Sequence, residues 1–332
     1  MRDGAFSGGD FQVHLNQFAA GTAALDMTAT DEFASLLQSA SELGIPHDPH
    51  VRYSSRNVVA RHLRFNVLDW GPENAPVIFC LHGGHQSAHS WDLVSLSLAR
   101  HYRVIAPDQR GHGDTEWARS ASYSNLEMAA DAAALVDALG LTRPLIMGHS
   151  MGGRNTLLCA LKNPALARAL VTVDIGPEVS AKGRNIIAGF VAANEEFDDM
   201  AAFVENVRKY DPYRSLEHIE RTVKYNLFQR ADGKLVSKCD RAPRTLNVNR
   251  DEGTELLTIE SVGNLPMPVL VVRGESSNVL EAEAAERFEA ALQHGQLRTV
   301  ANCGHNVHSQ NTLGFLQAVE PFFAANSNGT VK

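Results

Sequence analysis

GHSMGG, at Gly148 to Gly153, follows the apolar run PLIM and precedes RNTLLCALKNP, in which apolar residues recur at helical spacing. A strand, a G-x-S-x-G turn and a helix form a nucleophile elbow, which exposes a serine on a strained turn. The residues two before and two after that serine must be glycine, because side chains there would collide. The helix that begins next directs amide groups toward negative charge. We therefore expect Ser150 to be a nucleophile in an α/β protein.

Short apolar runs alternate with helical patterns on both sides of this turn. The segment VVARHLRFNVLDWG, residues 58–71, is expected to be extended. Buried strands are predicted for VIFCL, RVIAPD, PLIMGH, ALVTVD, PVLVVRG and LRTVAN, which begin at residues 77, 103, 144, 169, 268 and 297. Helices are predicted at 91–100, 125–139, 151–162, 281–292 and 311–324. This alternation predicts a mostly parallel, doubly wound sheet with right-handed crossovers.

The alternation stops between Pro177 and about Pro266. Residues 197–210 and 215–228 place apolar side chains at helical spacing, and ADGK at 231–234 is a turn signal. An insertion between two core strands would cover one end of the sheet as a cap. The predicted organisation is an N-terminal extension (1–50) with one helix from Asp31 to Gly44, an α/β core (51–177 and 266–325), a helical cap (178–265) and a tail (326–332).

The composition excludes several classes of protein. The chain has 332 residues, 44% of them hydrophobic, and a net charge of -8 without long acidic runs, which argues against nucleic acid and acidic membranes as partners. The first ten residues lack a signal-peptide pattern, and no apolar run approaches the roughly 20 residues that span a bilayer. The four cysteines form no CxxC pair and have no metal-ligand spacing. We expect a reduced, cytoplasmic protein without a metal, and homo-oligomerisation stays open.

A serine nucleophile needs a base and an oxyanion hole. His305 in GHNVH follows the last predicted strand, in a loop that can reach Ser150, whereas His308 is expected at the surface or behind the site. Preorganised donors for the oxyanion are expected from two backbone amides, those of Gly84 in LHGGH and of Met151 directly after the nucleophile.

These motifs together resemble the α/β-hydrolase superfamily, in its bacterial esterase and lactonase branch. The segments LHGGHQSAHSWD, PDQRGHGDT, GHSMGG, DIGPE, VLVVRGE and NCGHNVH occur in that family's order over about residues 55–325. The resemblance implies an eight-stranded sheet, a helical cap after strand six and no cofactor. It also implies that Arg110 and His112 brace a loop beside the site.

The acid of the triad departs from the family pattern. Most relatives place an aspartate after strand seven, in a segment resembling R-G-x-x-S-D, but RGESSNVL has Asn278 there. An asparagine has no charge with which to stabilise an imidazolium. Some relatives instead carry the acid after strand six, where Asp174 stands in VTVDIGP, 24 residues beyond the serine. Asp174 is the predicted acid; Glu275 and a site disabled at Asn278 are the alternatives.

The predicted function is hydrolysis of a small-molecule carboxylic ester or lactone through an acyl-enzyme. One rival is carbon-carbon bond hydrolysis of a ring-cleavage product, although relatives of that kind resemble this chain less because a tryptophan follows their catalytic histidine, where this chain has Asn306. Another rival is a slow or inactive ligand-binding homologue, which Asn278 favours. An apolar pocket is expected under the aromatic residues of the cap, namely Phe190, Phe197, Phe203, Tyr210, Tyr213 and Phe228.

Overall fold

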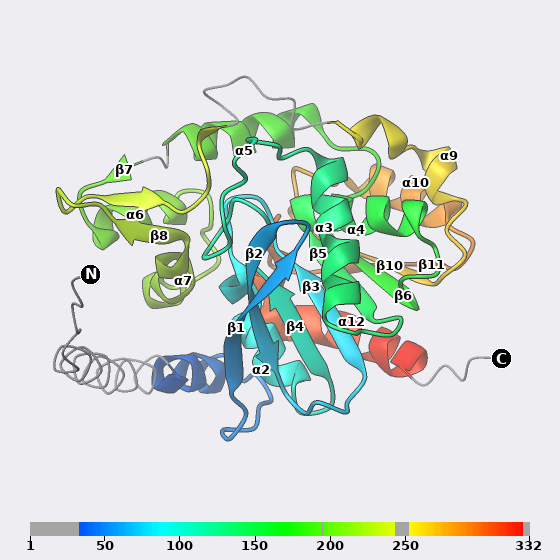
Figure 1. Ribbon diagram of the computed structural model, residues 1–332, viewed down its shortest axis with the longest axis horizontal. Coiled ribbons are helices and arrows are strands. Elements are labelled where there is room, and N and C mark those ends of the chain that lie inside the picture. Colours follow the sequence, from blue (N-terminus) through cyan, green and yellow to red (C-terminus); the bar gives the residue numbers. More distant parts are fainter. Residues whose placement is uncertain (1–32, 194–195, 243–251, 328–332) are drawn as a thin grey trace, which may run out of the picture. The chain divides into compact units, whose positions relative to one another are not determined.

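The computed structural model describes residues 33–193, 196–242 and 252–327 (Figure 1). The chain divides into two compact units, Met1–Gly44 and Ile45–Lys332. In the first unit a helix spans residues 33–42. It ends where Gly44 takes a φ of 64°, a left-handed conformation that favours glycine, and the Gly44 amide bonds to the Ser41 carbonyl. The helix predicted up to Gly44 is therefore found within the described residues.

The second unit is built on an eight-stranded sheet in the order β1-β2-β4-β3-β5-β6-β10-β11. The strands are β1 (Tyr53–Ala60), β2 (Leu63–Trp70), β3 (Val77–Leu81), β4 (Arg103–Pro107), β5 (Leu145–His149), β6 (Ala169–Val173), β10 (Val269–Gly274) and β11 (Gly295–Val300). Strand β2 pairs antiparallel with β1 and β4, and the other pairs are parallel. The predicted doubly wound α/β-hydrolase fold is confirmed.

Helices follow the strands as the sequence predicts. The helices of the core are α2 (Asp92–Leu98), α3 (Asn125–Ala138), α4 (Met151–Lys162), α10 (Ala282–Ala291), α11 (Val307–Gln310) and α12 (Thr312–Ser327), and a 3-10 turn, η1 (Ala88–Trp91), precedes α2. Helices α3 and α4 pack together, and α2 contacts α12. Every residue of β5 and β6 is buried, as expected for parallel strands that are covered on both faces.

The segment between β6 and β10 contains helices and a small sheet. The helical elements among its described residues are α5 (Ala181–Ala193), α6 (Met200–Arg208), α7 (Leu216–Val223), η2 (Lys224–Asn226), η3 (Thr254–Leu256) and α9 (Ile259–Val262). Helices α6 and α7 share an apolar cluster centred on Phe203 and Ile219. Three short strands, β7 (Glu196–Phe197), β8 (Leu227–Gln229) and β9 (Leu235–Ser237), pair in the order β7-β9-β8. They were not expected, because strands of two or three residues are too short to show an alternating pattern.

Two findings bear on the expectations from composition. All four cysteines are buried and none forms a disulfide. Among the described residues, no helix combines the length and apolar character needed to cross a membrane.

Candidate active site

Ser150 stands on the sharp turn between β5 and α4. Its backbone has a φ of 50° and a ψ of -113°, a strained conformation for a residue with a side chain. A Cβ atom on Gly148 would lie 2.3 Å from the Gly152 carbonyl oxygen, and one on Gly152 would lie 2.2 Å from the Leu81 carbonyl oxygen. The two glycines therefore allow the turn to close against β3, as the motif predicts.

His305 connects Ser150 to Asp174. The His305 Nε2 atom lies 3.0 Å from Ser150 Oγ, and Nδ1 lies 2.8 Å from Asp174 Oδ2. Because a carboxylate only accepts, Nδ1 carries the proton and Nε2 is free to accept the hydroxyl proton of the serine. The His305 side chain is 20% exposed and the Asp174 side chain is fully buried. The structure thus brings together the nucleophile, base and acid proposed from the sequence.

Asp174 is held by donors from the end of β10 and from the loop that follows it. The Gly274 amide donates to Oδ1 at 3.0 Å, and the Ser277 hydroxyl donates to Oδ2 at 2.5 Å. The Ser277 oxygen itself accepts from the Val279 amide at 3.0 Å, which fixes the hydroxyl. Asp174 has a φ of 53°, so its backbone is strained as well. The loop after β10 thus supplies a hydroxyl that orients the Asp174 carboxylate, a contact the sequence analysis missed.

The two alternative partners of His305 lie elsewhere. Glu275 is exposed, and its carboxylate accepts from the Asn302 amide at 3.3 Å. Asn278 is also exposed. Within the described residues, neither side chain hydrogen-bonds to His305, whose two ring nitrogens face Ser150 and Asp174.

Gly84 and Met151 lie beside the nucleophile. Both line the same cavity as Ser150, and a Cβ atom on Gly84 would lie 3.9 Å from the Met151 sulfur. Gln86 fixes the loop that carries Gly84, because its Oε1 accepts from the Gly83 amide at 2.9 Å. The two residues expected to form the oxyanion hole therefore both border the cavity that Ser150 lines.

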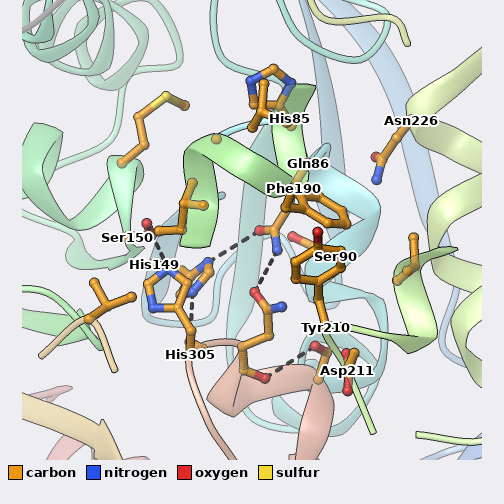
Figure 2. Close-up of a pocket in the computed structure, with 18 of the residues that line it drawn as sticks. His85, Gln86, Ser90, His149, Ser150, Phe190, Tyr210, Asp211, Asn226 and His305 are labelled. Atoms are coloured by element: carbon orange, nitrogen blue, oxygen red, sulfur yellow. Dashed lines mark hydrogen bonds between the residues drawn. The ribbon is translucent and has the colours of Figure 1, made fainter. Parts of the chain in front are cut away.

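Side chains that flank the site tie its loops together. The Gln86 amide group donates to Asn306 Oδ1 at 3.1 Å, and His149 Nε2 lies 2.9 Å from the His305 carbonyl oxygen (Figure 2). Burial, reinforced by the nearby His308 and His305, holds the pKa of His149 well below its ordinary value. His149 is therefore neutral at pH 7, and it fixes the backbone that carries the base.

Two further histidines are buried and uncharged. Burial, followed by the charge of His112, lowers the pKa of His82 to about 3, and its Nε2 accepts from the Gln109 amide at 2.9 Å. His308 is 1% exposed, and burial lowers its pKa to about 3. Its ring lies 4.3 Å from that of Trp91. His308 is thus packed behind the site and does not lie at the surface.

Arg110 and His112 stabilise the loop after β4. Arg110 donates to Asp131 at 2.6 Å and to the Ser122 carbonyl at 2.7 Å, while His112 Nδ1 lies 3.0 Å from the Arg110 carbonyl oxygen. This geometry is what the resemblance implies for the two residues. His112 Nε2 also lies 3.5 Å from the Cys239 sulfur, a contact that links the loop to the inserted segment.

A cavity of about 560 Å³ opens above Ser150. Its apolar walls come from both the core and the inserted segment, and Phe190, Phe203 and Tyr210 line it. The other three expected aromatics do not, because Phe197 packs on Phe203, while Tyr213 and Phe228 are 40% and 39% exposed. In Figure 2, Ser150, His149 and His305 lie on one side of the cavity and Ser90, Tyr210 and Asp211 lie across from them.

The cavity also has polar residues that the sequence analysis did not single out. Asp211 and Arg214 form an ion pair of 2.7 Å at its wall, with only 2% and 6% of their side chains exposed. Throughout the described ranges, no cluster of three or more histidine, cysteine or acidic side chains could hold a metal ion.

Comparisons with known proteins identify the family of the chain. Residues 76–312 match the family model described as the alpha/beta hydrolase fold. The chain is 28% identical to an esterase of Mycobacterium tuberculosis, over 89% of this chain and 96% of the relative. It is 29% identical to the 2-hydroxy-6-oxo-2,4-heptadienoate hydrolase of Pseudomonas putida, over 81% and 96%. The crystal structure of E-2-(acetamidomethylene)succinate hydrolase superposes with a TM-score of 0.74 at 25% identity, over 82% of this chain and 100% of that one.

Proposed function

Because the chain belongs to the α/β-hydrolase fold family, we propose that it is a serine hydrolase that cleaves a carboxylic ester or a lactone without a cofactor. The observation that carries this proposal is the His305 imidazole, which lies 3.0 Å from Ser150 Oγ and 2.8 Å from Asp174 Oδ2. This is the arrangement that generates a serine nucleophile at neutral pH.

The chemistry follows from the positions of these atoms. His305 Nε2 removes the Ser150 proton as Oγ attacks the substrate carbonyl, and the Asp174 carboxylate stabilises the imidazolium that forms. The amides of Gly84 and Met151 bind the oxyanion, and donors of this kind are each worth about 3 kcal/mol. Collapse of the tetrahedral intermediate breaks the ester bond, and His305 returns the proton to the leaving alcohol. Water, deprotonated by His305, then releases the acid and regenerates Ser150.

Carbon-carbon bond hydrolysis is the second candidate. The relative from Pseudomonas putida, whose name describes a hydrolase of a dienoate, is as similar to this chain as the esterase is. Against it stands Asn306, which occupies the position directly after the base and bonds to Gln86. A ligand-binding homologue without turnover is the weaker alternative, since His305 lies within hydrogen-bond distance of both Ser150 and Asp174.

A trapping experiment tests the proposal. The protein is mixed with excess 4-nitrophenyl acetate in a stopped-flow instrument, and a fluorophosphonate-treated sample is mapped by mass spectrometry. We expect a burst of nitrophenolate stoichiometric with the enzyme, steady turnover after it, and phosphonate on Ser150 alone. Ser150→Ala is the control and should show neither burst nor label. Turnover of a ring-cleavage dienoate without any ester turnover would instead assign the carbon-carbon reaction, and a burst followed by no turnover would indicate a binding protein.

A further inference from the structure

Three buried oxygen atoms at the cavity have no hydrogen-bond partner in the described part of the chain. They are Oγ of Ser90, Oδ1 of Asp211 and Oδ1 of Asn226, and all three residues line the cavity above Ser150. They come from separate elements: Ser90 from η1, Asp211 from the turn between α6 and α7, and Asn226 from η2. In Figure 2, all three lie on the side of the cavity away from Ser150.

The surroundings hold these residues in place. Asp211 is 1% exposed, and its other oxygen, Oδ2, accepts from Arg214 Nε at 2.7 Å. Arg214 in turn donates to Thr222 on α7 at 2.9 Å, so the carboxylate cannot rotate without breaking an ion pair. The Asp211 charge is therefore compensated by Arg214, while Oδ1 stays unused.

The segments that carry Ser90 and Asn226 are joined to each other. The preceding residues, His89 and Tyr225, stack with ring centroids 3.5 Å apart. The Ser90 amide bonds to Ser87 at 3.0 Å, and the Asn226 carbonyl accepts from Lys238 at 2.8 Å. The backbone is thus fixed at both residues, and the side-chain oxygens of Ser90 and Asn226 belong to a well-packed part of the cavity wall.

A buried polar atom without a partner is destabilising, and more so when it is charged, so a ligand that supplies the missing hydrogen bonds binds more tightly. A carboxylate oxygen and a carboxamide oxygen accept only, whereas a serine hydroxyl both accepts and donates. The Asp211 and Asn226 atoms can therefore be satisfied only by a donor. The complementary ligand carries O–H or N–H groups at this end of the cavity.

The charges of the cavity wall narrow the choice of donor. Asp211 is the single acidic residue among the described lining residues, whereas three arginines, Arg154, Arg184 and Arg214, line the cavity. This excess of positive charge opposes an ammonium group. Neutral donors, of which hydroxyl groups are the simplest, fit the three oxygens without a charge conflict.

We propose that the substrate is an ester whose part remote from the reacting carbonyl carries neutral hydrogen-bond donors, namely hydroxyl groups, bound by Ser90, Asp211 and Asn226. This inference rests on the proposed function. Apolar side chains, among them Val223 and Leu227, also line the cavity and suit the hydrocarbon that separates the donors from the ester.

The test compares esters that differ at one end only. 4-Nitrophenyl esters of unbranched acids of graded chain length are paired with their ω-hydroxy counterparts. Acetate esters of alkanols are paired with the monoacetates of the matching diols, and their hydrolysis is measured from the acetic acid that is released. We expect at least one chain length, on the acyl or the alcohol side, at which the hydroxyl raises kcat/KM by roughly tenfold or more, the size of one hydrogen bond to a charged acceptor.

Variants assign the preference to the residues. Ser90→Ala and Asn226→Leu remove two of the acceptors and should move the ratio of kcat/KM for the hydroxylated and plain esters toward one. Ile187→Ala is the matched control, since Ile187 lines the cavity without a polar side chain and should lower both values while keeping their ratio.

Three results would overturn the inference. The first is no preference for the hydroxylated ester at any chain length on the acyl or the alcohol side, and the second is a preference that both acceptor variants retain. The third is a stronger preference for ω-carboxylate esters, which would indicate that the arginines of the wall bind an anion. Each of these results leaves cleavage dependent on Ser150. If the proposed function itself were wrong, the wild-type protein would show no ester cleavage that depends on Ser150.

Discussion

Replacing Asp174 with asparagine keeps the shape of the side chain and removes its charge. In the native site the two carboxylate oxygens accept from Gly274, Ser277 and His305 at 3.0, 2.5 and 2.8 Å. An asparagine has only one accepting oxygen. If that oxygen keeps the Gly274 amide, the new NH2 group faces His305 Nδ1, which must then become an acceptor. The proton moves to Nε2, and His305 can no longer take the Ser150 proton.

The expected loss follows from this change of tautomer. Neutralising a triad aspartate with the geometry kept lowers turnover by about 10⁴, which corresponds to about 5.5 kcal/mol in the activation barrier. The assay is kcat on one chromogenic ester at pH 7, with a thermal melt to show that Asp174→Asn is folded.

Asn278→Asp is the matched control, because Asn278 is exposed and does not bond to His305 within the described residues. It should change kcat by less than about threefold, since exposed charges act weakly over a distance. If Asp174→Asn retained more than about a tenth of the activity, or if Asn278→Asp raised it by orders of magnitude, Asp174 would not be the acid.

Three further predictions use the surroundings of the triad. Ser277→Ala removes a hydrogen bond to the buried Asp174 carboxylate and should lower kcat by roughly tenfold or more in steady-state assays, with partial recovery in Ser277→Thr. Gly83→Ala would place a Cβ atom 2.5 Å from His149 Nδ1 and should lower kcat while circular dichroism shows an intact fold. The pKa of His308 is about 3 in the folded state, below the roughly 6.5 of an unfolded histidine. Between these two values the unfolded state binds more protons, so the free energy of unfolding falls as the pH drops below about 6.5. Urea unfolding at several pH values should show that His308→Phe reduces this dependence of the unfolding free energy on pH by about 1.4 kcal/mol per pH unit. The same pH dependence in the variant and the wild type would contradict the prediction.

Local sequence was enough to predict the fold and the centre of the site. The elbow at Ser150 combines a strand, a glycine-bounded turn and a helix, all within about twenty residues. Few other structures fit this pattern, so it predicts the elbow directly. The order of buried strands likewise predicts the parallel sheet. His305 was found because it follows the last predicted strand in a loop that can reach Ser150. Asp174 was found through the resemblance, because some relatives carry the acid after strand six.

Contacts between distant side chains could not be predicted in this way. Ser277 and Asp174 are 103 residues apart, and Gln86 and Asn306 are 220 apart. The sequence around a loop serine, or around a glutamine that follows a glycine pair, contains no pattern that indicates its hydrogen-bond partner. The Asp211 ion pair lies in the inserted segment, whose packing depends on short helices and strands with weak periodicity. Residues 1–32 of the predicted N-terminal extension lie outside the described residues, and a cytoplasmic location stays a prediction.

The most direct test of the central claim is the turnover of Ser150→Ala on the ester that the wild-type protein cleaves best. The variant should bind the substrate and melt as the wild type does, because the strain of the turn belongs to its backbone. Its kcat should fall by about 10⁶, the loss typical of a triad serine. A variant that keeps more than about a thousandth of the wild-type rate would show that Ser150 is not the nucleophile.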